Sequence, residues 1–271
     1  MMNKFFFLIV CALTLYSINV GAQAYIPDQT LNNDFNSQVR SLEEFQARFN
    51  GIESKPGIKK DASSLRNNII SLFDFQIDKS KLTKEQFIKK VNCFIDSVID
   101  NNVKFKIASA GLIVECKSKI LYNGVAKNVT LYLQQEKNSK GLYRWGLVGV
   151  KGLKEAGIIS DRYYTISPVE HEIHFMGLYD LINENPTHAH GYRSITRDLD
   201  ELSVFLTLVQ TKNIKFDSVI HQKYHCLDVP GFIFTISEKV SNGTNSGWLI
   251  DWFETYSTDD KKKYSNKLLK L

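Results

Sequence analysis

The residues best suited to chemistry gather in the second half of the chain. All six histidines lie there: His171, His174, His188, His190, His221 and His225. His171 and His174 stand one helical turn apart, and His221 and His225 share one face of an expected strand, so either pair could present imidazoles to a metal ion. The spacing is not that of an HExxH motif, however, and the loop histidines have no acidic neighbour. Surface and helix-terminal histidines are the favoured interpretation, and we predict no metal site.

A single carboxylate stands out in the last apolar run. Strict strand alternation puts Asp251 on one face with Leu249 and Phe253, and Trp252 on the other face with Trp248 and Ile250. An acid among apolar neighbours either points into a pocket, where it acts as acid, base or hydrogen-bond acceptor, or faces water. The candidate ligand-binding residues are Asp251, Tyr224, His225, His171 and Trp252. No catalytic residue is assigned.

The element that positions this carboxylate occurs twice. Residues 129–150 and 232–253 align without a gap at a spacing of 103 residues. Each copy is an alternating run, a polar turn and a second apolar run entered through Trp145 or Trp248, which is typical of an antiparallel hairpin. Asp251 then corresponds to Val148. The preceding helix ends also match, at a spacing of 111, so the repeat includes a helix and the first copy has about eight more residues between helix and hairpin.

Capping signals predict the helices. Ser41 with Glu44 and Thr83 with Gln86 form capping boxes, and further helices are expected at 65–75, after Ser167, and from 198 with Leu199, Leu202, Leu206 and Val209 on its apolar stripe. Strands are expected at 103–107 and 113–121, giving about four strands per half. Helices followed by an antiparallel meander indicate an α+β fold. We predict repeats at 23–155 and 160–257, their sheets packed together about a pseudo-twofold axis, and a solvated tail at 258–271.

The N-terminus predicts export. Lys4, an apolar run from Phe5 to Tyr16 and a small-residue exit before Gln23 are typical of a signal peptide spanning 1–22. Lipidation at Cys11 is the alternative, and the large Val10 disfavours it. The rest of the chain holds no membrane span. The net charge of the full sequence, +5, is spread too evenly for nucleic acid. We expect a periplasmic or secreted protein whose three remaining cysteines are buried as small apolar residues.

The order of elements resembles a known family. The segments EFQARFN at 44–50 and SPVEHEIHFMGLY at 167–179, together with the two hairpins, resemble the nuclear transport factor 2-like (cystatin-like) fold, in which a curved antiparallel sheet wraps a helix. The chain is similar to exported tandem proteins of this class from Bacteroidetes, most of them without an assigned function. The resemblance implies two such units. Enzymes of the class use Asp, His or Tyr inside the cone, but none of their motifs matches here residue by residue.

Two functions remain open. The aromatic content, and the absence of a recognisable nucleophile, metal or cofactor motif, favour a non-catalytic module that binds a small molecule or an envelope or extracellular protein. The alternative is a cofactor-free enzyme, such as an isomerase, dehydratase or hydrolase, with an acid/base site in the second repeat. In either case Asp251, Trp252 and the histidines place any small-molecule site in the second half, because a copy kept only for packing has no reason to acquire polar groups inside.

Overall fold

The computed structural model describes residues 39, 41–52, 64–74, 83–109, 111–137, 139–160, 162–163, 183, 186–240 and 246–269. The predicted signal segment 1–22, His171 and the expected helix after Ser167 lie outside them. The described helices are α2 (Leu42–Phe49), α3 (Ser64–Ile70), α4 (Lys84–Asp100), the 3-10 helix η3 (Pro186–Tyr192), α6 (Glu201–Gln210) and α7 (Thr258–Leu269). The strands are β1 (Leu112–Tyr122), β2 (Val125–Lys137), β3 (Tyr143–Lys151), β4 (Ile214–Cys226), β5 (Phe232–Lys239) and β6 (Gly247–Thr255). The fold is α+β, as predicted.

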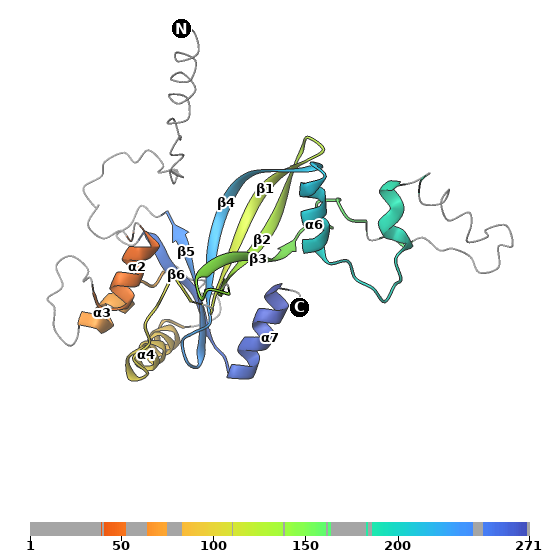
Figure 1. Cartoon of the computed structure of the whole chain (residues 1–271). Coiled ribbons are helices and arrows are strands. Elements are labelled where there is room, and N and C mark those ends of the chain that lie inside the picture. Colours follow the sequence, from red (N-terminus) through yellow and green to blue (C-terminus); the bar gives the residue numbers. More distant parts are fainter. Residues whose placement is uncertain are drawn as a thin grey trace, which may run out of the picture. The chain divides into compact units, whose positions relative to one another are not determined.

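The six strands form one antiparallel sheet in the order β3-β2-β1-β4-β5-β6 (Figure 1). Each half contributes a three-stranded meander, and the two join where β1 pairs with β4 over most of their length. The prediction of two sheets packed face against face is therefore wrong. A meander leaves the backbone groups of its first strand unpaired on one side, and pairing the two first strands satisfies both edges at once. The division into repeats at 155–160 stays a prediction.

The two outer hairpins repeat each other pair by pair. Tyr132 pairs with Gly149 and Leu133 with Leu147, which leaves Val148 as the extra residue of a β-bulge. In the second copy Thr235 pairs with Trp252 and Ile236 with Ile250, which leaves Asp251 as the extra residue. The gapless alignment of the sequence thus corresponds to the same register and the same bulge in both halves.

Local signals explain where the helices begin. Thr83 and Gln86 form the predicted capping box at the start of α4, with both reciprocal hydrogen bonds present. The Asp200 carboxylate accepts from the backbone amides of Leu202 and Ser203 at the start of α6. Each N-cap supplies an acceptor for amides that have no partner within the helix.

Helices of the first half cover strands of the second half. Phe94 of α4 is fully buried, and its ring lies 5.3 Å from that of Phe232, 5.4 Å from that of Phe234 and 5.8 Å from that of Phe253. These three rings belong to β5 and β6, and the residues of α2 and α3 join the same core cluster. Figure 1 shows α2, α3 and α4 beside β5 and β6.

Helix α6 makes the reciprocal contact. Its Phe205 packs in a second core with Ile120, Val129 and Val150, which lie on β1, β2 and β3. The Glu201 carboxylate at the start of α6 accepts from the backbone amide of Leu153, just after β3. Each half therefore buries apolar strand residues under a helix supplied by the other half. Both main cores thus contain residues of both halves.

Helix α7 lies on the opposite face of the sheet. Along β1, Leu112 and Ile120 face the cores under α4 and α6, whereas Ile113 packs with Leu269 of α7. Lys261 anchors the helix by donating from its Nζ to the backbone carbonyls of Leu227 and Val229. A terminal helix over 259–271 was expected and α7 confirms it, but the expectation that it is merely solvated is wrong, because α7 buries Leu269 against the sheet.

Three further expectations need correction. Residues 103–107 form no strand and connect α4 to β1, which is where the first copy carries its extra residues. Of the predicted stripe, Leu199 and Leu202 pack on the second core, whereas Leu206 and Val209 are 50% and 41% exposed and the buried apolar side chain of α6 is Phe205. The predicted apolar stripe is thus displaced around the helix, toward the residue that reaches the sheet. Within the described ranges each half also contributes three strands and not four.

Candidate functional site

The face of the sheet that carries α7 is hollowed over the second half. The depression measures about 450 Å³ and lies on β1, β4, β5 and β6, with α7 as a wall. It is lined by Glu115, Lys117, His221, Lys223, His225, Thr235, Lys239, Asp251, Trp252 and Tyr264. Its volume lies in the range of small-molecule sites, although its lining is more polar than most.

Asp251 lies at the floor of the depression. Its side chain is 6% exposed and accepts hydrogen bonds from the hydroxyls of Thr235 and Ser237, the latter at 2.7 Å. The ammonium groups of Lys223 and Lys239 lie 3.1 Å and 3.5 Å from its carboxylate. Burial alone would raise its pKa, but the two hydroxyls and the charge of Lys223 together hold the pKa below its usual value. Asp251 is therefore a buried, fully partnered anion.

A hydrogen-bonded chain joins α7 to the sheet beside this carboxylate. The Nδ1 of His225 lies 2.8 Å from the hydroxyl oxygen of Tyr264, and its Nε2 lies 3.2 Å from a carboxylate oxygen of Glu115. The hydrogen bond to His225 lowers the pKa of Glu115. Burial raises the pKa of Tyr264, so its phenol keeps its proton at neutral pH. When the ionised Glu115 accepts a hydrogen bond from Nε2–H of His225, Nδ1 is unprotonated. Nδ1 can then accept a hydrogen bond from the phenol of Tyr264.

Trp252 supplies an aromatic wall. Its ring stacks on that of Tyr264 with centroids 6.0 Å apart and an angle of 11° between the planes. Strict alternation put Trp252 on the face opposite Asp251, and this prediction is wrong. Because the bulge inserts Asp251 as an extra residue, the two consecutive side chains line the same depression.

The corresponding place in the first half is apolar. Tyr132 and Val148, the counterparts of Thr235 and Asp251, pack in a small cluster with Leu268 and Leu269 at the end of α7. The counterpart of Trp252 is Gly149, and a Cβ built there would lie 3.4 Å from the backbone oxygen of Leu269. The end of α7 thus occupies the space that a tryptophan has in the other copy.

A second depression of about 400 Å³ adjoins the first and shares Lys117 with it. It lies mainly on β1, β2 and the segment after β3, and its lining contains neither an aromatic ring nor a histidine. It therefore offers fewer groups that could orient a ligand.

The predicted site residues fall into three groups. Asp251, Trp252 and His225 line one depression. Tyr224 does not: its ring packs edge-on against Trp248, with centroids 5.4 Å apart, on the side of the main core. His171 lies outside the described residues.

Sequence reasoning missed the remaining polar groups of the site. Glu115 comes from the other half, and Tyr264 comes from the segment expected to be a tail. Lys223 lies two residues from each neighbouring histidine, at His221 and His225, so alternation from those residues would have found it. No local pattern marks Glu115 or Tyr264, because the β1·β4 pairing and the path of α7 bring them there.

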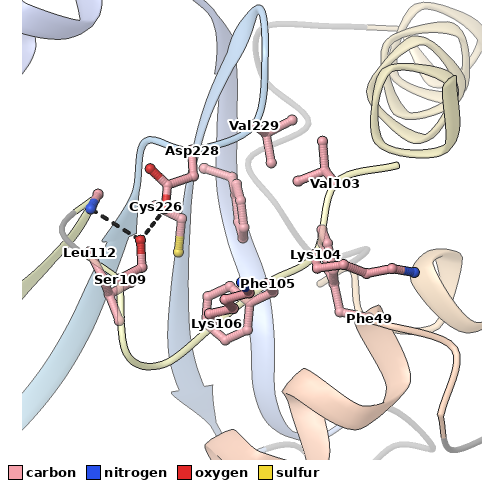
Figure 2. A pocket seen from close by; sticks show the side chains of 12 residues that line it. Phe49, Val103, Lys104, Phe105, Lys106, Ser109, Leu112, Cys226, Asp228 and Val229 are labelled. Carbon is pink, nitrogen blue, oxygen red and sulfur yellow. Dashed lines mark hydrogen bonds between the residues drawn. The ribbon is translucent and has the colours of Figure 1, made fainter. Parts of the chain in front are cut away.

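A smaller cavity lies on the other side of the sheet, between Phe49, Phe105 and Cys226 (Figure 2). It measures about 20 Å³, which holds one water molecule at most. Ser109 donates to the Asp228 carboxylate at its edge, as Figure 2 shows. This cavity is a packing gap and not a ligand site.

The cysteines differ in environment. Cys226 is buried, Cys116 is half-buried and Cys93 is exposed, and all three are free thiols. The expectation that all three are buried is therefore wrong for Cys93.

Within the part of the chain that the structure describes, no group of three or more His, Cys, Asp or Glu side chains could hold a metal ion. Over the same ranges no helix is both long and apolar enough to cross a bilayer. Comparison with protein-family models, curated proteins and solved structures finds no match to this chain.

Proposed function

We propose that this protein is an exported, non-catalytic binding module whose small-molecule site is the depression at Asp251, Trp252 and His225. The observation that carries the proposal is the state of Asp251, whose carboxylate is buried, ionised and occupied by two hydroxyls and two lysines. A carboxylate with a lowered pKa and four partners is a weak general base. It does serve to hold two lysine side chains in fixed positions beside an aromatic wall.

The second candidate is a cofactor-free acid/base enzyme at the same place. The Tyr264–His225–Glu115 chain favours it, because a histidine oriented by a carboxylate can move a proton at Tyr264. It ranks second because the phenol of Tyr264 already donates its proton in the hydrogen bond to His225.

Export, the nuclear transport factor 2-like architecture and an intramolecular pseudo-dimer of two repeats belong to the same proposal. The identical registers of the two hairpins and the reciprocal helix packing support the pseudo-dimer. N-terminal sequencing of secreted material should give Gln23 as the first residue, and a start at Met1 or a lipidated Cys11 would contradict export.

A blocking substitution tests the binding function. A library of small polar compounds is screened by ligand-detected NMR against the wild type, against His221→Trp, which fills the depression, and against Ile220→Trp, which fills the adjoining one. Binding lost in the first variant and kept in the second supports the proposal. Binding that survives His221→Trp, or no binding by any compound, contradicts it. Conversion of a bound compound that stops in Tyr264→Phe would instead establish the enzyme.

A further inference from the structure

Around the depression the carboxylates are more deeply buried than the lysine ammonium groups. The carboxylate side chains are 6% exposed at Asp251 and 17% exposed at Glu115. The lysine side chains that face them are 30% exposed at Lys223 and 38% exposed at Lys239, and Lys117 is also exposed. A solute entering the depression therefore meets ammonium groups before it can meet a carboxylate.

The buried carboxylates are already committed to partners. Asp251 is held by Thr235, Ser237, Lys223 and Lys239, and Glu115 is held by His225. Asp74 adds a partner for Lys239 at 4.0 Å. Among the described residues Lys117 forms no ion pair. An anion can therefore bind to its ammonium without breaking an existing ion pair.

The charges around His221, at the opening of the depression, are mainly positive. Burial is the largest cause that lowers its pKa, and the charges of Lys223, Lys117 and Lys239 lower it further, while Asp251 alone opposes them. His221 is thus neutral at pH 7, and it offers a hydrogen bond without adding to the charge.

We propose that the depression binds a small ring-shaped anion, with its carboxylate beside Lys117 and Lys223 and its ring against Trp252. The inference rests on the binding function proposed above and names its ligand class. The half-buried Trp252, held in place by stacking on Tyr264, gives the ring a flat apolar surface. Asp251, a buried acid that a ligand cannot easily contact, keeps Lys223 within reach of the ligand.

Three probes of one shape and different charge test the ligand class. Benzoate, benzamide and benzamidine are titrated into the full chain, and dissociation constants are taken from the indole N–H resonance of Trp252, assigned with Trp252→Phe. Benzoate should bind most tightly and benzamidine most weakly, since each exposed ion pair contributes up to about fivefold in affinity. The preference should shrink as salt is raised, because exposed charges are screened.

Matched substitutions locate the effect. Lys117→Gln should remove most of the preference for benzoate over benzamide and leave benzamide binding unchanged. Lys119→Gln, on the same strand and paired with Asp217 outside the depression, should leave both unchanged. Equal binding of the three probes, or tighter binding of benzamidine, overturns the anion inference and leaves the binding function standing. If none of the probes moves the resonance while other compounds bind in the screen, the ring-anion class is likewise wrong. If nothing binds in either experiment, the binding function itself fails.

Discussion

Asp251 and Val148 occupy the same place in two hairpins of one chain. The two hairpins have the same register, and each residue is the extra residue of the β-bulge in its hairpin. One is a carboxylate held by hydroxyls and lysines, and the other packs in an apolar cluster with the end of α7. The bulge aims both side chains at the same face of the sheet. The chemistry at each bulge therefore depends on the inserted residue and on the part of α7 that covers it.

Exchanging the character of the first bulge should be costly. Val148→Asp would place a carboxylate in the apolar cluster with Leu268, Leu269 and Tyr132, and should lower the free energy of unfolding by about 2 kcal/mol. Val125→Asp, at a side chain that is 58% exposed near the start of β2, should cost little. Urea denaturation of both variants measures the difference. Equal stability of the two would mean that the first-half position is open to water.

The anion at the second bulge makes the stability depend on pH. Because the pKa of Asp251 is lower in the folded protein than the ordinary value of an aspartate, ionised Asp251 stabilises the fold above that ordinary value. This contribution is lost as the pH falls through the folded pKa. Asp251→Asn should therefore lower stability by about 2 kcal/mol at pH 7 and flatten the decline in stability below about pH 4.

Asp217→Asn is the control for this experiment. Asp217 forms an exposed pair with Lys119 at 3.7 Å and accepts an exposed hydrogen bond from the Ser218 hydroxyl at 3.1 Å, and its removal should leave the pH profile unchanged. An unaltered profile in Asp251→Asn would show that Asp251 is protonated or solvated in the folded protein.

The reciprocal packing predicts that the two halves unfold together. Phe94→Ala removes a ring buried against β5 and β6 and should lower the free energy of unfolding by about 3–5 kcal/mol. Ile99→Ala, on the same helix but 36% exposed, should cost much less. Amide exchange followed residue by residue should show the same loss of protection in β2 and in β5. A loss confined to β5 and β6 would show two independent cores.

The phenol of Tyr264 should matter more to stability than that of its neighbour. Tyr264→Phe keeps the stacking on Trp252 but removes the hydrogen bond to His225, and should cost about 1 kcal/mol. Tyr256→Phe keeps a ring that contacts both Trp252 and Tyr264, and should be close to neutral. Thermal unfolding compares the two. If Tyr264→Phe is as stable as the wild type, the chain to Glu115 does not hold α7.

The sequence reveals those parts of the fold that depend on neighbouring residues. The capping box at Thr83 predicts the start of α4, and the gapless repeat predicts both hairpins. It does not reveal which strand edges join, because pairing β1 with β4 depends on backbone groups that every residue carries. Nor does it reveal that helices exchange partners between halves, since apolar residues such as Phe94 would serve a core of either half.

The site divides in the same way. Asp251, Trp252 and His225 are visible in the sequence because they depart from the pattern of the first copy or share a strand face. Glu115 and Tyr264 are not, because they reach the depression from another half and from the final helix. The bulge brings Asp251 and Trp252, which were expected on opposite faces, to the same depression, and a strict period of two residues cannot anticipate this.

The three tryptophans give the most direct test of the central claim that ligands bind at the second bulge. Trp145 lies in the first hairpin, Trp248 packs beside Tyr224, and Trp252 lines the depression. The protein is labelled with 5-fluorotryptophan, its three ¹⁹F resonances are assigned by single Trp→Phe variants, and benzoate is titrated in. The resonance of Trp252 should move while those of Trp145 and Trp248 stay in place. Movement of Trp145 or Trp248 with Trp252 unchanged would contradict the account.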